Sequence, residues 1–239
     1  MSLLDSLKTD NNIANESDVL GGGGAVESGV YDATIKVAYI GKSTGGAMSL
    51  NLELNMGGRD VRQQLWVTSG DAKGNKNYYE RDGKRNYLPG FNIANALSLL
   101  TVGKEISQLD TEDKVLKLWS YDAKAEVPTT VPVLTDLTGQ EIRVGMIKQT
   151  VDKNVKNDAG AYVPSGETRE ENEIDKLFRS KDGLTVAEIR AEATSADFMD
   201  AWAKKWTGVT KNKAKGATGG STAGAPKAAA APKSTSLFS

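Results

Sequence analysis

The sequence contains no cysteine and no histidine among its 239 residues. Without cysteine the chain cannot form a disulfide, a thiolate metal site or a thiol nucleophile. Without histidine it lacks the commonest general base and the commonest zinc ligand. Acidic pairs such as Glu170 and Glu171 lie in polar connections with no other ligand type near them. We therefore expect a protein that is not an enzyme and that needs no metal or other cofactor.

Long hydrophobic runs are missing as well. No stretch approaches the ~20 apolar residues of a membrane-spanning helix. The N-terminal sequence MSLLDSLKTDNN has no basic segment followed by an apolar one, so it does not match a secretory signal. We expect no membrane association and a cytoplasmic location. A hydrophobic fraction of 38% with 25 glycines predicts a compact core well short of the full length.

Charge is nearly balanced overall, at −1, but it is unevenly distributed. Residues 201–239 contain seven lysines and no acid, so the first 200 residues carry −8. Beyond residue 208 nearly all residues are Lys, Ala, Gly, Ser, Thr or Pro, and such a composition cannot bury enough apolar surface to offset the entropy of ordering. We expect a disordered tail over 209–239, whose apolar tip, Leu237 and Phe238, is a candidate partner-binding site.

Three segments between residues 30 and 67 alternate between apolar and polar residues, which is typical of strands with one buried and one solvated face. The first is VYDATIKVAYI, whose buried face is expected to run from Tyr31 through alternate residues to Tyr39. The second is AMSLNLELNM and the third is RDVRQQLWV. Strands four and five are expected in DKVLKLWSYDAKAEV and EIRVGMIKQTVDK, with PTTVPVLTDLTGQ as the linker between them.

Helical spacing appears first in FNIANALSLLTVG, between the third and fourth strands. Gly103 is well placed to end that helix. Short helices are also expected in REENEIDKLFRSKDG, in LTVAEIRAEA and in SADFMDAWAKKWTG. In the second of these, Thr185 followed by Glu188 three residues later is a capping box.

Five strands with one helix after the third fit an oligonucleotide-binding (OB) barrel. The expected fold is therefore mainly β, a five-stranded OB-fold Greek-key barrel with a helix between strands 3 and 4, short C-terminal helices and disordered termini. The corresponding divisions are a flexible N-terminal arm over 1–28, a barrel that binds single-stranded DNA (ssDNA) over 29–153, a loop and helical extension over 154–208, and the tail over 209–239.

Rings and cations alternate on the solvated faces and in the loop after the third strand, a pattern by which proteins hold single-stranded nucleic acid. Trp66, Trp119 and Tyr121 are the expected stacking residues, and the loop over 73–87 is expected to contact phosphates. The alternatives are that the rings pack under the later helices and that the loop is a solvated hairpin. The complete expected ssDNA-binding set is Lys42, Arg62, Gln64, Trp66, Lys73, Lys76, Tyr78, Tyr79, Arg81, Lys84, Arg85, Tyr87, Lys117, Trp119 and Tyr121.

Four stretches resemble the ssDNA-binding proteins of tailed bacteriophages, the OB-fold replication proteins of the T7-like kind. They are SGVYDATIKVAYIGKSTGGAMSLNLEL, RQQLWV, LPGFNIANALSLLTVG and ENEIDKLFRSKDGLTVAEI, and the resemblance extends over residues 29 to about 190. The resemblance implies a protein that coats and protects ssDNA, with little sequence specificity, during phage DNA replication, recombination and repair in the host cytoplasm. It also implies contacts with the phage replicative DNA polymerase and helicase/primase, and a possible homodimer.

One feature departs from that family. Its members often end in an acidic tail with a terminal aromatic residue, whereas here Phe238 follows a basic tail. The principal alternative function is a phage protein–protein interaction module or structural β-barrel without DNA binding. A polysaccharide-binding or nuclease-like protein is a further alternative, against which the missing histidines argue.

Overall fold

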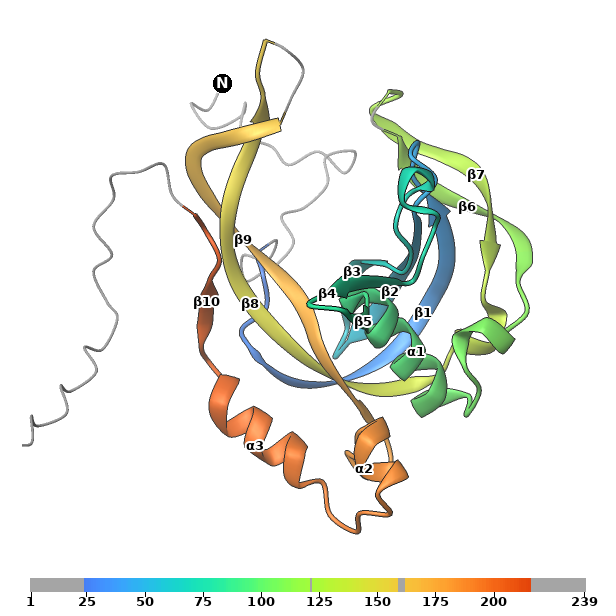
Figure 1. The fold of residues 1–239 in the computed structure, drawn as a ribbon, viewed down its shortest axis with the longest axis vertical. Helices are drawn as coiled ribbons and strands as arrows, with labels where there is room; N and C mark the ends of the chain where they lie inside the picture. Colours follow the sequence, from blue (N-terminus) through green and yellow to red (C-terminus); the bar gives the residue numbers. More distant parts are fainter. Residues whose placement is uncertain (1–23, 121, 159–161, 216–239) are drawn as a thin grey trace, which may run out of the picture.

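The computed structural model describes residues 24–120, 122–158 and 162–215 (Figure 1). The described chain is mainly β, as the sequence predicted. An eight-stranded sheet contains β1 (Gly29–Lys42), β2 (Met48–Met56), β3 (Arg59–Trp66), β6 (Glu112–Ser120), β7 (Ala125–Val133), β8 (Glu141–Lys156), β9 (Tyr162–Arg179) and β10 (Thr210–Asn212). A two-stranded sheet contains β4 (Tyr78–Arg81) and β5 (Lys84–Tyr87). The helices are α1 (Pro89–Thr101), α2 (Val186–Arg190) and α3 (Asp197–Trp206).

Strand β1 lies at the centre of the large sheet. One edge pairs with β2, which in turn pairs with β3. The other edge pairs with β8 over residues 29–34 and meets β7 at Tyr39. Strand β9 pairs with the far edge of β8, and β6 pairs with β7. Figure 1 shows β8 and β9 rising on one side of β1–β3 and β6 and β7 on the other.

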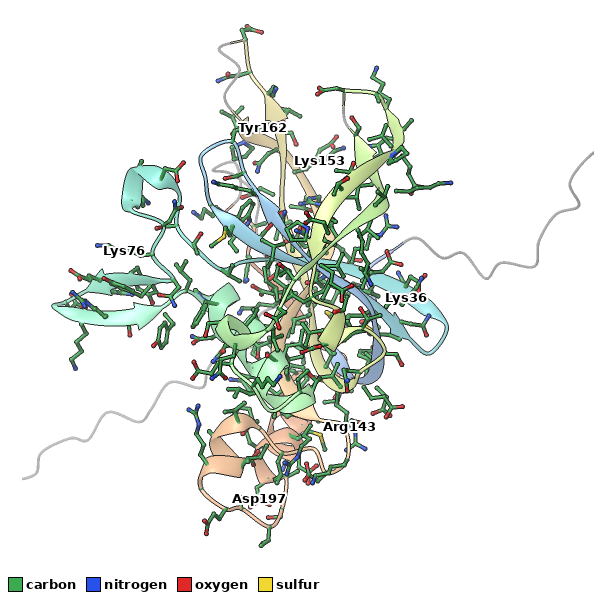
Figure 2. The ribbon with its side chains drawn as sticks, turned by 90° about the vertical axis from the view of Figure 1, so that its right-hand side faces the viewer. Lys36, Lys76, Arg143, Lys153, Tyr162 and Asp197 are labelled. Atoms are coloured by element: carbon green, nitrogen blue, oxygen red, sulfur yellow. The ribbon has the colours of Figure 1, made fainter. Side chains whose placement is uncertain are left out.

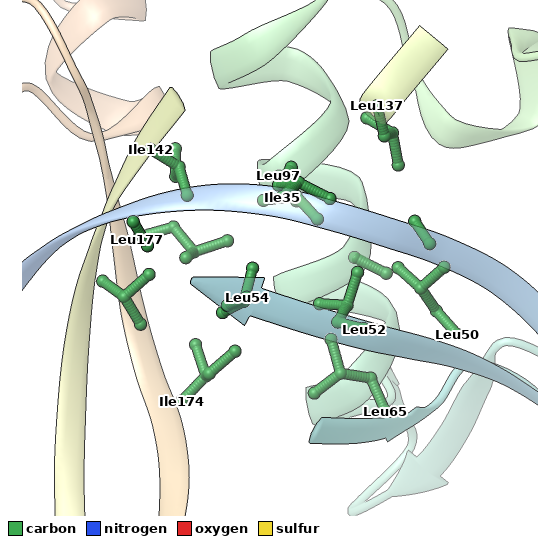
Figure 3. Close-up of a cluster of buried hydrophobic side chains, with 14 of the residues drawn as sticks. Ile35, Leu50, Leu52, Leu54, Leu65, Leu97, Leu137, Ile142, Ile174 and Leu177 are labelled. Carbon is green, nitrogen blue, oxygen red and sulfur yellow. The ribbon is translucent and has the colours of Figure 1, made fainter. Parts of the chain in front are cut away.

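The main hydrophobic core lies between α1 and the inner faces of β1, β2, β3, β8 and β9 (Figure 3). Alternate β2 residues Leu50, Leu52 and Leu54 are buried, as the strand pattern predicted. Helix α1 contributes Leu97 at 1% exposure. Its predicted end is also confirmed, since Gly103 takes a left-handed φ of 79° and donates its N–H to Ser98.

A β-bulge in β1 changes which of its side chains face the core. The register with β2 shifts between Ile35 and Val37. Ile35 is fully buried, but beyond the bulge Ala38 takes the inner position, and Val37 and Tyr39 are only half-buried. The uniform alternation predicted from Tyr31 to Tyr39 is therefore wrong past Ile35, because one extra residue reverses the faces of the strand.

The helix predicted over 169–183 is wrong, because β9 continues to Arg179. The helical spacing arises from a bulge in this strand: Ile174 pairs with Met146, whereas Lys176 pairs with Gly145. Asp175 is the extra residue, so Ile174 and Leu177 both reach the main core although they are three residues apart. The predicted short helices that follow are confirmed, and Thr185 and Glu188 form both hydrogen bonds of the capping box.

The prediction of five strands also missed β7 and β10. Pro128 and Pro132 had indicated a linker, but β7 pairs with β6 along its length and with β1 only at Val133. Proline is tolerated in a strand with one largely unpaired edge. Strand β10 lies in the predicted disordered tail, where it pairs in parallel with β8. Strand β8 itself runs through the predicted boundary at residue 153.

A smaller core covers the outer face of β8 and β9. Trp202 of α3 packs there with Ile147 and Phe178, and all three are buried. Gln149 of β8 is buried too, and its Nε2 donates a hydrogen bond to Glu171 Oε1 at 2.9 Å. No helix among the described residues has the length and apolarity to cross a membrane.

Gly90 fixes the start of α1 against the end of β3. A Cβ added at Gly90 would lie 2.3 Å from the backbone oxygen of Trp66. We expect Gly90→Ala to lower the free energy of unfolding by about 1–3 kcal/mol, because the backbones of α1 and β3 must move apart to make room for the added methyl group. Gly45→Ala is the matched control, since its nearest neighbour would be Ser43 Oγ at 4.0 Å. Urea unfolding of both variants tests this, and equal stability would contradict it.

Candidate nucleic-acid interface

A cavity of about 720 Å³ lies between the outer face of β1–β3 and the β6–β7 hairpin. It brings Arg62 and Gln64 of β3 together with Lys117 and Trp119 of β6, four members of the predicted binding set. We call it the hairpin groove, and its lining is Val37, Tyr39, Asn51–Glu53, Arg62–Gln64, Leu116–Trp119 and Glu126.

Alternation along β6 places its polar side chains at the open side of the hairpin groove. Leu116 and Leu118 are half-buried, whereas Lys117 and Trp119 are exposed. The indole of Trp119 is 54% exposed. Its large apolar surface is therefore available to a ligand. Tyr121, the next predicted ring on this strand's solvated side, lies outside the described residues.

Glu53 organises the cations of the hairpin groove. Its two carboxylate oxygens lie 2.8 Å from Lys36 Nζ and 2.9 Å from Arg62 Nε. The hydrogen bond from Lys36 lowers the pKa of Glu53, burial opposes that shift, and Arg62 adds to it. The hydrogen bond with Glu53 in turn raises the pKa of Arg62. Because Glu53 engages Nε and the Arg62 side chain stays 70% exposed, its Nη groups are accessible to a ligand.

Gln64 is held in a small amide and hydroxyl network on the floor of the hairpin groove. Its Nε2 lies 3.2 Å from Asn51 Oδ1 and 3.3 Å from Ser49 Oγ. All three residues lie on the outer faces of β2 and β3. This floor offers polar groups that can hydrogen-bond without carrying charge.

A second cavity, of about 1130 Å³, lies between the edges of β3 and β9. We call it the edge cavity. Five predicted residues line one end of it: Trp66, Lys73, Tyr79, Arg85 and Tyr87. The edge cavity and the hairpin groove share Gln63 and Gln64, so they form one continuous surface across β3. Trp66 is 43% exposed on that surface and is not sealed in a core.

The predicted basic loop is an ordered hairpin, and its rings have different surroundings. Tyr78 is half-buried, with Lys76 Nζ 5.6 Å and Arg85 Cζ 5.0 Å from its ring centroid. The faces of the Tyr78 ring are therefore in contact with these two cations. The ring is better placed to hold the cations in position than to stack a base. Tyr79 is exposed and lines the edge cavity. Figure 2 shows Lys76 in the loop that leads into the β4–β5 hairpin, which projects from the body.

Acidic residues of β9 line the edge cavity opposite the cations, and the sequence-based site did not include them. They are Glu171, Glu173 and Asp175, and Lys176 follows them. Tyr39, in the hairpin groove, was also missed, because the bulge in β1 moved it from the predicted core to the outer face. Residues 37–40 are all apolar, so no alternation in the sequence marks this change of face.

Some predicted residues stand apart from both cavities. Lys42, Arg81 and Lys84 are exposed but line neither of them. Leu237 and Phe238 lie outside the described residues. Among the described residues, no group of three or more acidic side chains is placed to hold a metal ion.

No protein-family model matches the chain, and no curated protein matches it.

The lowered pKa of Glu53 has a defined effect on stability. The ion pairs of Glu53 contribute fully above its ordinary pKa of 4.5, and their contribution is lost as the pH falls through the lower folded-state value. We expect Glu53→Gln to lower the free energy of unfolding by about 1 kcal/mol at neutral pH. The difference from the parent protein should vanish in acid.

Urea unfolding at a series of pH values measures this difference. Glu126→Gln is the control, because Glu126 lines the same groove and attracts Arg62 only at longer range, with no ion pair within 4.0 Å among the described residues. A pH-independent difference for Glu53→Gln would contradict the role given to the carboxylate.

Proposed function

We propose that the protein binds ssDNA with little sequence preference along the outer face of β3. The observation that supports this most strongly is the hairpin groove, where Arg62 and Gln64 meet Lys117 and Trp119 from a strand more than fifty residues away. Two exposed indoles, Trp66 and Trp119, border one continuous surface. Stacking on aromatic rings holds unpaired bases whatever their identity, since every base has a π-face.

The arrangement of charge suggests how a strand would lie. In the hairpin groove Arg62 and Lys117 are balanced by Glu53 and Glu126, so the floor has little net charge. Bases would lie over the uncharged floor and against Trp119. Phosphates would lie toward Lys117, which has no ion-pair partner within 4.0 Å among the described residues, and toward the accessible Nη groups of Arg62.

The end of the proposed path lies at the β4–β5 hairpin. Arg62 and Trp66 are four residues apart on β3, about 13 Å at 3.3 Å per residue. Beyond Trp66 the exposed rings of Tyr79 and Tyr87 continue the surface. Lys73 and Arg85 supply cations there, although Arg85 Nε is paired with Glu80 at 3.0 Å.

The assignment of the sheet to an OB-type fold is part of this proposal. We assign β1, β2 and β3, followed by α1, the β6–β7 hairpin and β8, to an OB-type core, to which β9 and β10 are additions. With this assignment the protein is a nonenzymatic ssDNA-binding protein of the tailed-phage kind. It would act in DNA replication, recombination and repair in the host cytoplasm, with the replicative polymerase and helicase/primase as protein partners and a homodimer as a possible state.

Removing either exposed indole tests the stacking role. We expect Trp66→Ala and Trp119→Ala each to weaken binding to a labelled oligo-dT by about 5- to 150-fold, the equivalent of 1–3 kcal/mol per stacked base. Fluorescence anisotropy titration measures the affinity. Phe198→Ala is the control, because Phe198 is also an exposed ring but lies on α3 and lines neither cavity.

Unchanged affinity in both folded tryptophan variants would rule out the proposed path. Absence of any gel shift by the parent protein would favour the alternative, a protein-interaction module.

Phosphate contact by Lys117 is tested by the salt dependence of binding. Counterion release gives a slope of log K against log salt of about −0.7 per phosphate contacted on a single strand. We expect Lys117→Gln to make the slope less negative by about that amount. Lys204→Gln is the matched control on α3, outside both cavities. Equal slopes for the two variants would exclude phosphate contact by Lys117.

A further inference from the structure

The edges of β3 and β9 face each other without pairing. Within the described part of the chain no backbone hydrogen bond joins the two strands, and β3 pairs only with β2. Gln63 of β3 donates a hydrogen bond from Nε2 to the backbone oxygen of Asn172 of β9, at 3.1 Å. Paired strands lie about 4.8 Å apart and bond backbone to backbone. Here a whole glutamine side chain spans the separation.

The space between these edges is continuous. A cavity of about 460 Å³ lies between residues 59–64 of β3 and residues 170–172 of β9. It shares Gln63, Gln64, Glu171 and Asn172 with the edge cavity, which continues to Trp66 and Lys176. We call the two together the strand gap. Its edge-cavity part has apolar lining from Leu65, Ile93 and Ile174.

The N-terminal end of the described chain lies in the mouth of the strand gap. Gly24 and Ala25 line the smaller cavity. Arg59 of β3 donates a hydrogen bond from Nη2 to the backbone oxygen of Gly24. From β9, Asn172 accepts from the backbone N–H of Val26 and donates to its C=O, both at 2.8 Å. Both walls of the gap therefore hold the chain where residues 1–23 join it.

We propose that residues 1–23 turn back into the strand gap and pair with the free edge of β3. Gly21–Gly24 provide the backbone freedom for the reversal. Val19 and Leu20 come next and match the apolar lining. The 23 residues can extend about 75 Å at ~3.3 Å each, whereas the eight residues of β3 span about 26 Å, so reach is ample.

Two physical terms favour this segment over an independent peptide. Its tether at Gly24 gives it a high effective concentration at the gap. Unpaired edges are also a template for pairing with other chains, and a strand supplied by the same chain satisfies their N–H and C=O groups. The outer face of β3, with Arg62, Gln64 and Trp66, stays open in this arrangement. The inference does not depend on DNA binding.

Hydrogen exchange without nucleic acid tests the pairing. We expect the amides of residues 59–65 that do not bond to β2 to exchange about tenfold or more slowly in the full chain than in a variant lacking residues 1–22. A variant lacking residues 216–239 is the control and should keep the slow exchange. Equal exchange in the full chain and in the variant lacking residues 1–22 would overturn the proposal.

A spin label gives the location independently, because the chain has no native cysteine. A nitroxide on Leu20→Cys should broaden backbone amide signals of β3 and β9 within the same molecule. Broadening elsewhere would overturn the assignment. Broadening of unlabelled, isotope-enriched molecules mixed with labelled ones would instead show pairing with a second copy and would overturn pairing within one chain.

Discussion

The backbone pairing of β1 is the constraint on which the rest of the structure depends. This strand gives one edge to β2 and divides the other between β8 and β7. The division sends β8 and β9 to one side and β6 and β7 to the other. Without it the outer face of β3 would have no wall opposite it, and neither cavity of the candidate interface would exist.

Hydrophobic periodicity correctly predicted the strands and helices in which the buried and exposed sides keep a constant period. Leu50, Leu52 and Leu54 alternate regularly and are buried, and the spacing around Leu97 gives a helix. Prediction failed where a bulge changed the period. In β9 the extra residue Asp175 gave Ile174 and Leu177 a helical spacing within a strand. A bulge is decided by pairing with another strand, so the local sequence alone does not show it.

The candidate site was predictable to a similar extent. Trp66, Arg62 and Gln64 could be placed on a solvated face because their own strand alternates cleanly. Lys117 and Trp119 join them because the β6–β7 hairpin folds over the sheet. No short-range sequence pattern encodes that arrangement. The basic loop was recognised by composition, but the placement of Tyr78 between Lys76 and Arg85 follows from hairpin register.

The contact between Asp175 and Trp202 limits how the chain can be dissected. The indole N–H of Trp202 donates to Asp175 Oδ2 at 2.7 Å, and the ring packs edge-on against Phe178. A fragment ending before α3 would leave Phe178 and Ile147 uncovered on the outer face of the sheet. Such a fragment would expose an apolar surface that promotes aggregation. The smallest piece suitable for expression therefore extends through α3, however compact the strands that carry the interface look by themselves.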